Sequence, residues 1–400
     1  MDRSSLKPRL LGASLITVLI ASACGGASSG TAPPSGGPSA PAAPVPASTG
    51  TPPGPTASGV AATPGATSST PPDPASPAPS TDGGSPLPSQ DATAATWTRL
   101  ADGGGPEARS DHTWSVDDQG VYAYLFGGLA QTGALDDLWR LDLASGGWER
   151  LDPAGDRPAA RFGHVGVWAP GVGLVVWSGQ AGSTFFDDIW AFEPGAGSWP
   201  RLPDAGDRPA ARYGSCGAID AQGRLWVSHG FTDSGRFDDT RVYDFTSESW
   251  SAVATVGEVP IKRCLHDCLW SADGRFLLYA GQTNGEPALG DLWALDPATS
   301  TWSREPRAAP EPRQLYAVAT VGGAAVVFGG ADADRTKLDT SYLLDLTTLA
   351  WSPLDPTSER PSGRSGATLI ADPARERLLL FGGIDDEAAQ DDLWEMRIGG

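Results

Sequence analysis

The chain has 400 residues and is rich in Gly (51), Pro (36) and Trp (15), but only 19% of its residues are charged. So much Gly and Pro argues against a helical bundle and for many turns or a disordered segment. Acidic residues outnumber basic ones and give a formal net charge of −20. Nucleic-acid binding is therefore excluded, because it needs a basic surface.

Residues 1–23 have the pattern of a secretory signal peptide. Three basic residues precede the uncharged run 10–23, which is too short to cross a bilayer. The run ends in Ala21-Ser22-Ala23-Cys24, which resembles a bacterial lipobox. That resemblance implies lipidation of Cys24 and a lipoprotein at the cell surface or in the periplasm. Ala21 and Ala23 also fit an ordinary signal-peptidase site, so free secretion is the alternative.

Residues 24–94 form a second compositional segment. They are almost entirely Gly, Ala, Ser, Thr and Pro, with no aromatic residue. Such a segment buries too little apolar surface to offset the entropy of ordering. We expect a disordered tether that joins the N-terminal anchor to a folded domain at 95–400.

Four landmarks recur six times within residues 95–400. A Trp returns every 49 to 52 residues, at Trp97, Trp148, Trp199, Trp250, Trp302 and Trp351. An Arg closing a Pro-x-x-Arg motif follows it, at Arg109, Arg161, Arg212, Arg263, Arg313 and Arg364. An apolar run then ends at Gly128, Gly179, Gly230, Gly281, Gly330 and Gly383. An acidic position, usually in a pair, comes last, as in Asp136-Asp137 and Asp391-Asp392.

Each unit predicts four short strands separated by turns. The first strand follows Pro-x-x-Arg, the second is the apolar run, the third follows the acidic position and the fourth holds the Trp. One sheet of about 50 residues leaves its faces uncovered, whereas six sheets arranged radially cover one another.

These repeats resemble Kelch repeats, as found in Kelch propellers and in the central domain of galactose oxidase. The double Gly of that family stands at Gly127-Gly128, Gly329-Gly330 and Gly382-Gly383, and the other units keep the second Gly. The resemblance covers Trp97 to the C-terminus. It implies an all-β, six-bladed Kelch-type β-propeller.

The last unit ends after its third strand, while a spare fourth strand stands at residues 95–101. We therefore predict that the N-terminal strand completes the sixth blade and closes the ring. Without it, that blade would expose an open sheet edge.

The six arginines are candidate ligand-binding residues. All of them begin the innermost strand, so we expect a ring of guanidinium groups at one rim of the central channel. Arginines from this region bind acidic peptides in some Kelch proteins, and a guanidinium suits carboxylate recognition. The alternative is that each Arg pairs with acidic residues of its own or a neighbouring blade and orients the loops.

Three of the four histidines share one repeat position, three residues after the Arg: His112, His164 and His266. A shared metal is conceivable, but equivalent positions on different blades lie too far apart, so packing is the interpretation we adopt. The acidic loops at Asp332 and Asp385 could hold Ca²⁺ or be solvated surface, and we adopt the second. We predict no metal site, no catalytic residue and no cofactor.

Three cysteines fall in the folded domain, and an oxidising compartment permits a disulfide. Cys264 and Cys268 are too far apart on one strand to pair. Cys216 lies at the matching level of the preceding blade, so a Cys216–Cys268 bridge is the predicted pairing, with Cys264 reduced.

The function predicted from the sequence is binding. A monomeric propeller would hold a protein, peptide or glycan partner through the loops between strands and would meet the membrane only through its lipid anchor. The alternative is a carbohydrate-active enzyme on a Kelch scaffold, an oxidase or one similar to sialic-acid epimerases. A purely structural surface protein is a third possibility.

Overall fold

The computed structural model describes residues 93–307, 309–357 and 359–399. The predicted signal peptide (1–23), Cys24 and the tether (24–94) lie outside these ranges, except that Thr93 and Ala94 begin strand β1 (Thr93–Asp102). Within the described ranges no helix is long and apolar enough to span a membrane.

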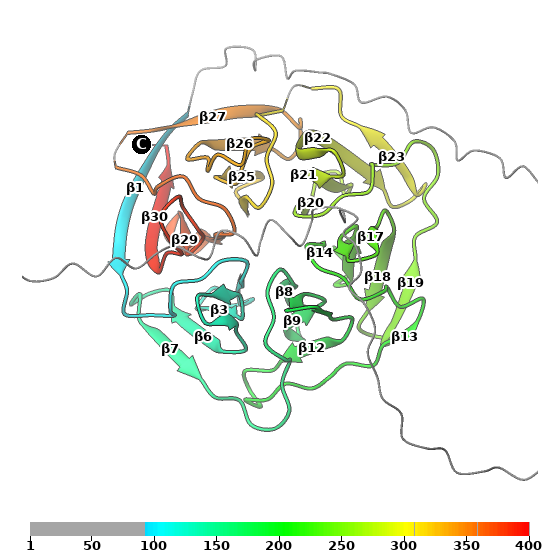
Figure 1. Ribbon diagram of the computed structural model, residues 1–400, viewed down its shortest axis with the longest axis horizontal. Coiled ribbons are helices and arrows are strands. Elements are labelled where there is room, and N and C mark those ends of the chain that lie inside the picture. Colours follow the sequence, from blue (N-terminus) through cyan, green and yellow to red (C-terminus); the bar gives the residue numbers. More distant parts are fainter. Residues whose placement is uncertain (1–92, 308, 358, 400) are drawn as a thin grey trace, which may run out of the picture. The chain divides into compact units, whose positions relative to one another are not determined.

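The strands are arranged as six blades around a central axis (Figure 1). Blade 1 contains β2 (Thr113–Val116), β3 (Tyr122–Phe126), β6 (Leu138–Asp142) and β7 (Trp148–Leu151). Blade 2 contains β8 (Val165–Ala169), β9 (Gly173–Trp177) and β12 (Ile189–Phe192). Blade 3 contains β14 (Cys216–Ile219), β15 (Leu225–Ser228), β18 (Thr240–Asp244) and β19 (Ser249–Ala252), with β13 (Ala205–Gly206) parallel to β19.

Blades 4 to 6 continue the ring. Blade 4 contains β20 (Asp267–Trp270), β21 (Phe276–Thr283), β22 (Glu286–Asp296) and β23 (Thr301–Arg304). Blade 5 contains β24 (Ala317–Val321), β25 (Ala324–Phe328), β26 (Ser341–Asp345) and β27 (Trp351–Pro356). Blade 6 contains β28 (Thr368–Asp372), β29 (Arg377–Phe381), β30 (Asp392–Ile398) and β1, with the 3₁₀ turn η1 (Pro373–Arg375) between β28 and β29.

Two-stranded hairpins extend the second and third strands of blades 1 to 3. They are β4 (Leu129–Ala130) with β5 (Gly133–Ala134), β10 (Gln180–Ala181) with β11 (Thr184–Phe185), and β16 (Phe231–Thr232) with β17 (Gly235–Arg236). In blade 4 the same extension is continuous with β21 and β22, whose pairing reaches Thr283 and Glu286.

The prediction of a regular fourth strand in every unit is wrong for blade 2. Its segment 198–201 makes only isolated bridges: Ser198 with Glu193 and with Ala154, and Arg201 with Trp190. Pro200 has no N–H to donate to a ladder, although its carbonyl accepts the N–H of Ala191 at 3.1 Å.

The second strand of each blade is buried on both faces. In β3, Ala123 and Leu125 pack toward blade 6, while Tyr124 and Phe126 pack toward blade 2. This alternation follows from the two-residue period of a strand. Six apolar clusters result, one at each of the six junctions between neighbouring blades.

The N-terminal strand closes the ring, and this prediction is confirmed. β1 pairs antiparallel with β30, with Trp97 opposite Met396, and lies beside it in Figure 1. Its first residues also pair in parallel with β27 of blade 5. The first and last strands of the domain therefore share one sheet.

Two circles of backbone hydrogen bonds join the blades around the axis. In the first, the residue two after each Arg donates its N–H to the equivalent carbonyl of the preceding blade at 2.8–3.1 Å. Its members are Asp111, Gly163, Gly214, Leu265, Leu315 and Gly366. In the second, the six landmark glycines donate to the carbonyl of the landmark Arg in the next blade at 2.8–3.0 Å.

The backbone explains why only the second Gly of each pair is kept. At Gly179 φ is +100°, and a Cβ there would lie 2.8 Å from the Cβ of His164. Only Gly adopts that conformation without strain. The first position has φ near +60°, where Ser178, His229 and Ala280 stand, at a cost of about 1–2 kcal/mol for an L-residue.

Candidate functional site

The six landmark arginines are buried, and no side chain among them is more than 2% exposed. Arg161 shows the arrangement. Its Nε donates to the carbonyl of Ala159 at 3.0 Å, and Nη1 donates to the carbonyl of Ser178 at 2.9 Å. Its two terminal nitrogens also bind Asp188 in a bidentate pair at 2.7 and 3.0 Å.

The acidic landmark supplies the partner carboxylate in five of the six blades. These carboxylates are Asp137, Asp188, Asp239, Asp291 and Asp392. Each accepts a second hydrogen bond from the side chain two residues later. That donor is a Trp indole in four blades (Trp139, Trp190, Trp293 and Trp394) and Arg241 in blade 3.

Blade 5 departs from this pattern because Thr340 replaces the Asp. Glu311 supplies the carboxylate instead and accepts from Arg313 at 2.6 Å, from the Thr340 hydroxyl at 2.6 Å and from the Tyr342 hydroxyl at 2.8 Å. The buried guanidinium is therefore neutralised in every blade.

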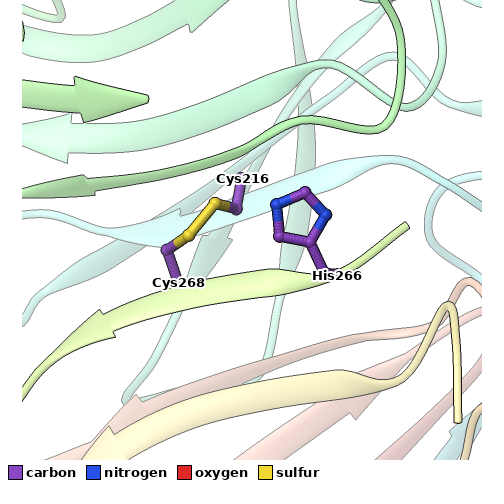
Figure 2. A group of neighbouring side chains, drawn as sticks. All are labelled: Cys216, His266 and Cys268. Atoms are coloured by element: carbon purple, nitrogen blue, oxygen red, sulfur yellow. A yellow bond between two sulfur atoms is a disulfide. The ribbon is translucent and has the colours of Figure 1, made fainter. Parts of the chain in front are cut away.

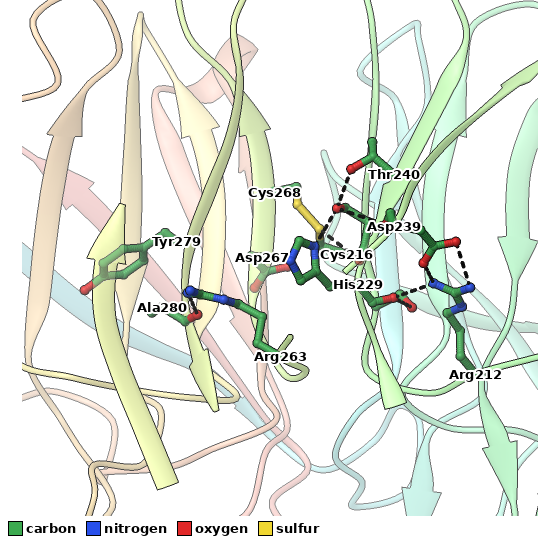
Figure 3. The surroundings of a disulfide bond; sticks show 12 residues. Arg212, Cys216, His229, Asp239, Thr240, Arg263, Asp267, Cys268, Tyr279 and Ala280 are labelled. Carbon is green, nitrogen blue, oxygen red and sulfur yellow. Dashed lines mark hydrogen bonds and ion pairs between the residues drawn. A yellow bond between two sulfur atoms is a disulfide. The ribbon is translucent and has the colours of Figure 1, made fainter. Parts of the chain in front are cut away.

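The carboxylates of Asp188 and Asp291 are held ionised. Burial alone would raise the pKa of Asp188, but the hydrogen bonds and the charge of Arg161 outweigh it and lower the pKa below its usual value. The same balance lowers the pKa of Asp291 beside Arg263. Figure 3 shows the equivalent pair of Arg212 and Asp239.

The proposed ligand-binding role of the arginines is thus corrected. Their hydrogen-bonding groups are directed at loop carbonyls and at a carboxylate of the same blade, and their side chains are shielded from solvent. Four of the five N–H groups of Arg161 are already hydrogen-bonded, so this buried guanidinium cannot form a second bidentate pair with an incoming acidic peptide. The geometry supports the alternative, in which each Arg fixes the loops of its own blade.

The histidines at the shared repeat position pack against the preceding blade. His112 lies edge-on to Phe381 and His164 edge-on to Phe126, with ring centroids 5.6 and 5.4 Å apart. The Nε2 of His164 is also 2.8 Å from the Thr113 hydroxyl. Burial, followed by the charge of Arg109, lowers the pKa of His112 to about 3. Among the described residues, these imidazoles are not brought to a common metal.

Asp111 is adjacent to His112 in the sequence and Asp267 to His266, but the structure shows no hydrogen bond within either pair of these described residues. Asp111 accepts from the Ser110 hydroxyl at 2.7 Å, while His112 packs on Phe381. Asp267 lines the central channel, and burial raises its pKa to about 7. The acidic loops cap their own turns: Asp332 Oδ1 accepts two backbone N–H groups, as does Asp385 Oδ1.

Cys216 and Cys268 form a disulfide with a Cα–Cα distance of 5.3 Å, and Cys264 is reduced and buried. The bridge joins β14 of blade 3 to β20 of blade 4. It lies on the wall of a channel cavity of about 280 Å³ lined by the innermost strands.

A comparison with family models matches residues 87–278 and 256–399 to the KLHDC2/KLHL20/DRC7 Kelch-repeats domain. The chain belongs to the Kelch-repeat family. Domains of this family typically mediate protein interactions. In this Kelch propeller the six landmark arginines are buried scaffold residues and do not form a binding surface.

Three curated relatives illustrate the range of proteins that carry this domain. The chain is 29% identical to acyl-CoA-binding domain-containing protein 4 of Arabidopsis thaliana, over 70% of this chain and 43% of that protein. It is 28% identical to Kelch domain-containing protein 1 of Mus musculus, over 58% and 66% of the two chains. It is 27% identical to the F-box/kelch-repeat protein At1g51550 of Arabidopsis thaliana, over 71% and 68%. The chain thus spans less than half the length of the first of these relatives.

Sequence reasoning missed an apolar loop between blades 3 and 4, residues 253–262. Val256, Val259 and Ile261 are 54%, 39% and 52% exposed there. The loop lies along β23 through a bridge from Val256 to Thr301, and its end accepts a hydrogen bond from the Thr283 hydroxyl to the carbonyl of Lys262 at 2.6 Å.

Aligning the repeats reveals the signal. The two preceding loops read Ala-Gly-Asp-Arg-Pro-Ala at 154–159 and 205–210, whereas this loop reads Val-Gly-Glu-Val-Pro-Ile at 256–261. Two Ala positions hold the larger side chains of Val256 and Ile261, and the Arg position holds Val259. The Arg at the position of Val259 is Arg208 in the preceding loop, where it pairs with Asp187 at 2.5 Å and with Asp204 at 2.9 Å. Where the preceding loop forms surface ion pairs, this loop therefore exposes aliphatic side chains.

Proposed function

We propose that this Kelch propeller is a lipid-anchored, extracytoplasmic binding module that holds a protein or peptide partner through the apolar loop 253–262. The exposure of Val256, Val259 and Ile261 within one loop carries the proposal. Other loops at equivalent positions keep small or charged residues, so scaffolding does not require hydrocarbon here.

A protein partner is favoured over a glycan by the chemistry of the loop. Sugar-binding surfaces present exposed aromatic rings, whereas the large exposed hydrophobic side chains among the described residues are aliphatic: Leu100, Val121, Val256, Val259 and Ile261. Aliphatic side chains gain most from burial against apolar residues of another chain. Lys262 and Asp238 flank the loop and would form the polar rim.

To test whether the loop binds the partner, its apolar side chains are replaced by those found at the same positions in the neighbouring repeats. The variant Val256→Ala, Val259→Arg, Ile261→Ala should fold normally, because residues 154, 157 and 159 carry the same side chains in blade 2. We expect quantitative pull-down from the native envelope to capture the partner about 10-fold less well with this variant.

Val121→Ser is the matched control, because Val121 is 44% exposed in a different turn, in blade 1. It should capture the partner as well as the wild type does. Equal capture by the wild type and the loop variant, or no specific capture by the wild type, would refute the proposed site.

The lipid anchor is tested separately through Cys24. Wild-type protein made in a bacterial host should incorporate labelled fatty acid and sediment with membranes. Cys24→Ser should lose both properties and leave the folding of the propeller unchanged. Membrane association of the wild type without label, or free secretion of the wild type, would show that this part of the proposal is wrong.

A further inference from the structure

The junction between blades 3 and 4 differs from the other five. Elsewhere the residue before the landmark Gly pair is aromatic: Phe126, Trp177, Tyr279, Phe328 and Phe381. Each of these packs on the landmark Trp of the next blade, with ring centroids 4.7–5.5 Å apart. At the end of β15 in blade 3 this position is Ser228.

Polar and sulfur side chains fill the place of the missing ring. His229 packs edge-on to His266 with centroids 5.5 Å apart, and the Cys216–Cys268 bridge lies beside them. His266 and Cys268 are two residues apart at the start of β20, so they project to the same side, toward Cys216 of blade 3. Figure 2 shows the imidazole beside the sulfur atoms.

These three side chains form a ligand set for a soft metal ion. One nitrogen of His266 and the sulfurs of Cys216 and Cys268 all lie within 4.8 Å of one another. The three residues are 4%, 2% and 8% exposed. Neither ring nitrogen of His266 makes a hydrogen bond of good geometry, although the residue is buried and the backbone of Ser228 and Cys264 lies close to the ring. A buried polar group without such a bond calls for a physical explanation.

His112 also has buried ring nitrogens without such a bond. Its neighbour, however, is Phe381, and among the described residues it belongs to no group of three side chains that could hold one ion. Only at His266 do two sulfur atoms complete a set.

We propose that Cys216, Cys268 and His266 form a redox-gated binding site for a thiophilic cation such as Zn²⁺. In the oxidised protein the two sulfurs are joined to each other and the site is closed. A small dithiol opens it: the S–S bond breaks, two electrons and two protons pass to the cysteines, and the reductant leaves as its own disulfide. Zn²⁺ then displaces the two thiol protons and binds two thiolates and the imidazole.

The dimensions and the access route fit this chemistry. One ring nitrogen of His266 and the two sulfurs lie within 4.8 Å of one another, so Zn–S and Zn–N bonds of about 2.3 and 2.0–2.1 Å can reach a common ion once the S–S bond breaks and the two sulfurs move apart. Three protein ligands leave a fourth position for water. Cys216, His266 and Cys268 line the channel cavity, which gives a small ion and a small reductant a path to the site.

The test uses the full chain with Cys24→Ser and Cys264→Ser, so that only the two bridging cysteines remain. After reduction by a phosphine, the protein should bind one Zn²⁺ per chain. With Co²⁺ it should show sulfur-to-cobalt charge transfer and the intense visible bands of a tetrahedral site. The same protein before reduction should bind neither ion at this site.

Adding His266→Phe should weaken Zn²⁺ binding by more than about 100-fold, because loss of a ligand costs more than the roughly 10–100-fold typical for loss of a ligand's hydrogen-bond partner. Bound Zn²⁺ should also slow alkylation of Cys216 and Cys268, followed by mass spectrometry, which needs no variant at position 266. His112→Phe is the control and should leave both readouts unchanged. If the reduced protein keeps its native circular dichroism but binds no Zn²⁺, or binds it equally well with His266→Phe, the proposal is overturned.

Discussion

Truncation of the chain to begin at Asp102 is expected to produce the largest loss of stability in the propeller. The deletion removes nearly all of β1 and exposes the full edge of β30, with which Ala95 to Asp102 are paired. It also removes Trp97, which is 3% exposed and packs on Phe328 of blade 5 with centroids 5.1 Å apart. Truncating an aromatic residue of this size in a protein core lowers the free energy of unfolding by about 3–5 kcal/mol.

Because the ring is closed, the loss is not confined to blade 6. β1 also pairs with β27, so blades 5 and 6 lose a shared sheet. We expect the melting temperature to fall by more than 10 °C, at about 2–4 °C per kcal/mol for a domain of this size. A chain that begins at residue 91 keeps β1 and is the control. If the chain beginning at Asp102 had the same melting temperature as the intact domain, closure of the ring by β1 would not stabilise the propeller.

The repeat pattern was enough to predict the ring, the number of blades and the closing strand. These features depend on properties that recur in every unit, such as the spacing of Trp and the landmark Gly. The conformation at Gly281 shows why: φ is +95° and a Cβ would meet the carbonyl of Cys264 at 2.7 Å. Because every blade has this constraint, Gly occurs at the equivalent position in all six units.

The role of the arginines was harder to predict because charge alone does not say where a side chain points. The ring of Arg and the acidic positions were both visible, but their pairing across 27 or 28 residues becomes evident only when the second and third strands of a blade are placed side by side. Arg109 with Asp137 and Arg161 with Asp188 show separations of 28 and 27 residues. Blade 5 shows the limit of pattern reasoning, since Glu311 replaces the missing Asp from another position in the loop.

The candidate interaction loop and the candidate metal site were missed for the opposite reason. Both are departures from the repeat rather than landmarks of it. Val259 stands where three other units have Arg, and Ser228 stands where five units have an aromatic residue. The pairing of Cys216 with Cys268 could be predicted because the repeat supplies a common frame. The proximity of His266 to them could not, since it depends on what fills the place of the missing ring.

Arg161→Ala is expected to destabilise the propeller by about 3–5 kcal/mol, the usual effect of removing one partner of a buried ion pair. The substitution leaves the carboxylate of Asp188 and the carbonyl of Ser178 without their buried donor. It also removes the guanidinium that lies 4.1 Å from the ring centroid of Phe186. Arg161→Lys should recover only part of the loss, because an ammonium cannot reproduce the bidentate geometry.

The same loop provides the control. Arg157 is 43% exposed and its nearest carboxylate oxygens are 3.5 and 3.8 Å away. Arg157→Ala should therefore change the free energy of unfolding by less than about 1 kcal/mol. Thermal unfolding of the three variants at neutral pH measures these differences. Equal melting temperatures for Arg161→Ala and Arg157→Ala would contradict the scaffold role.

The pH dependence separates the ion pair from simple loss of packing. The pKa of Asp188 is lowered in the folded protein, so the pair's stabilisation is fully present above the unfolded-state pKa of about 4 and is lost as the pH falls through the folded-state pKa. The difference in melting temperature between wild type and Arg161→Ala should be largest near pH 8 and begin to narrow as the pH falls toward the pKa of Asp188 in the variant, which burial raises once Arg161 is gone. Below pH 4 it should narrow further, because protonation of Asp188 removes the charge in both proteins. A difference that does not change with pH would assign the whole effect to packing of the guanidinium against Phe186.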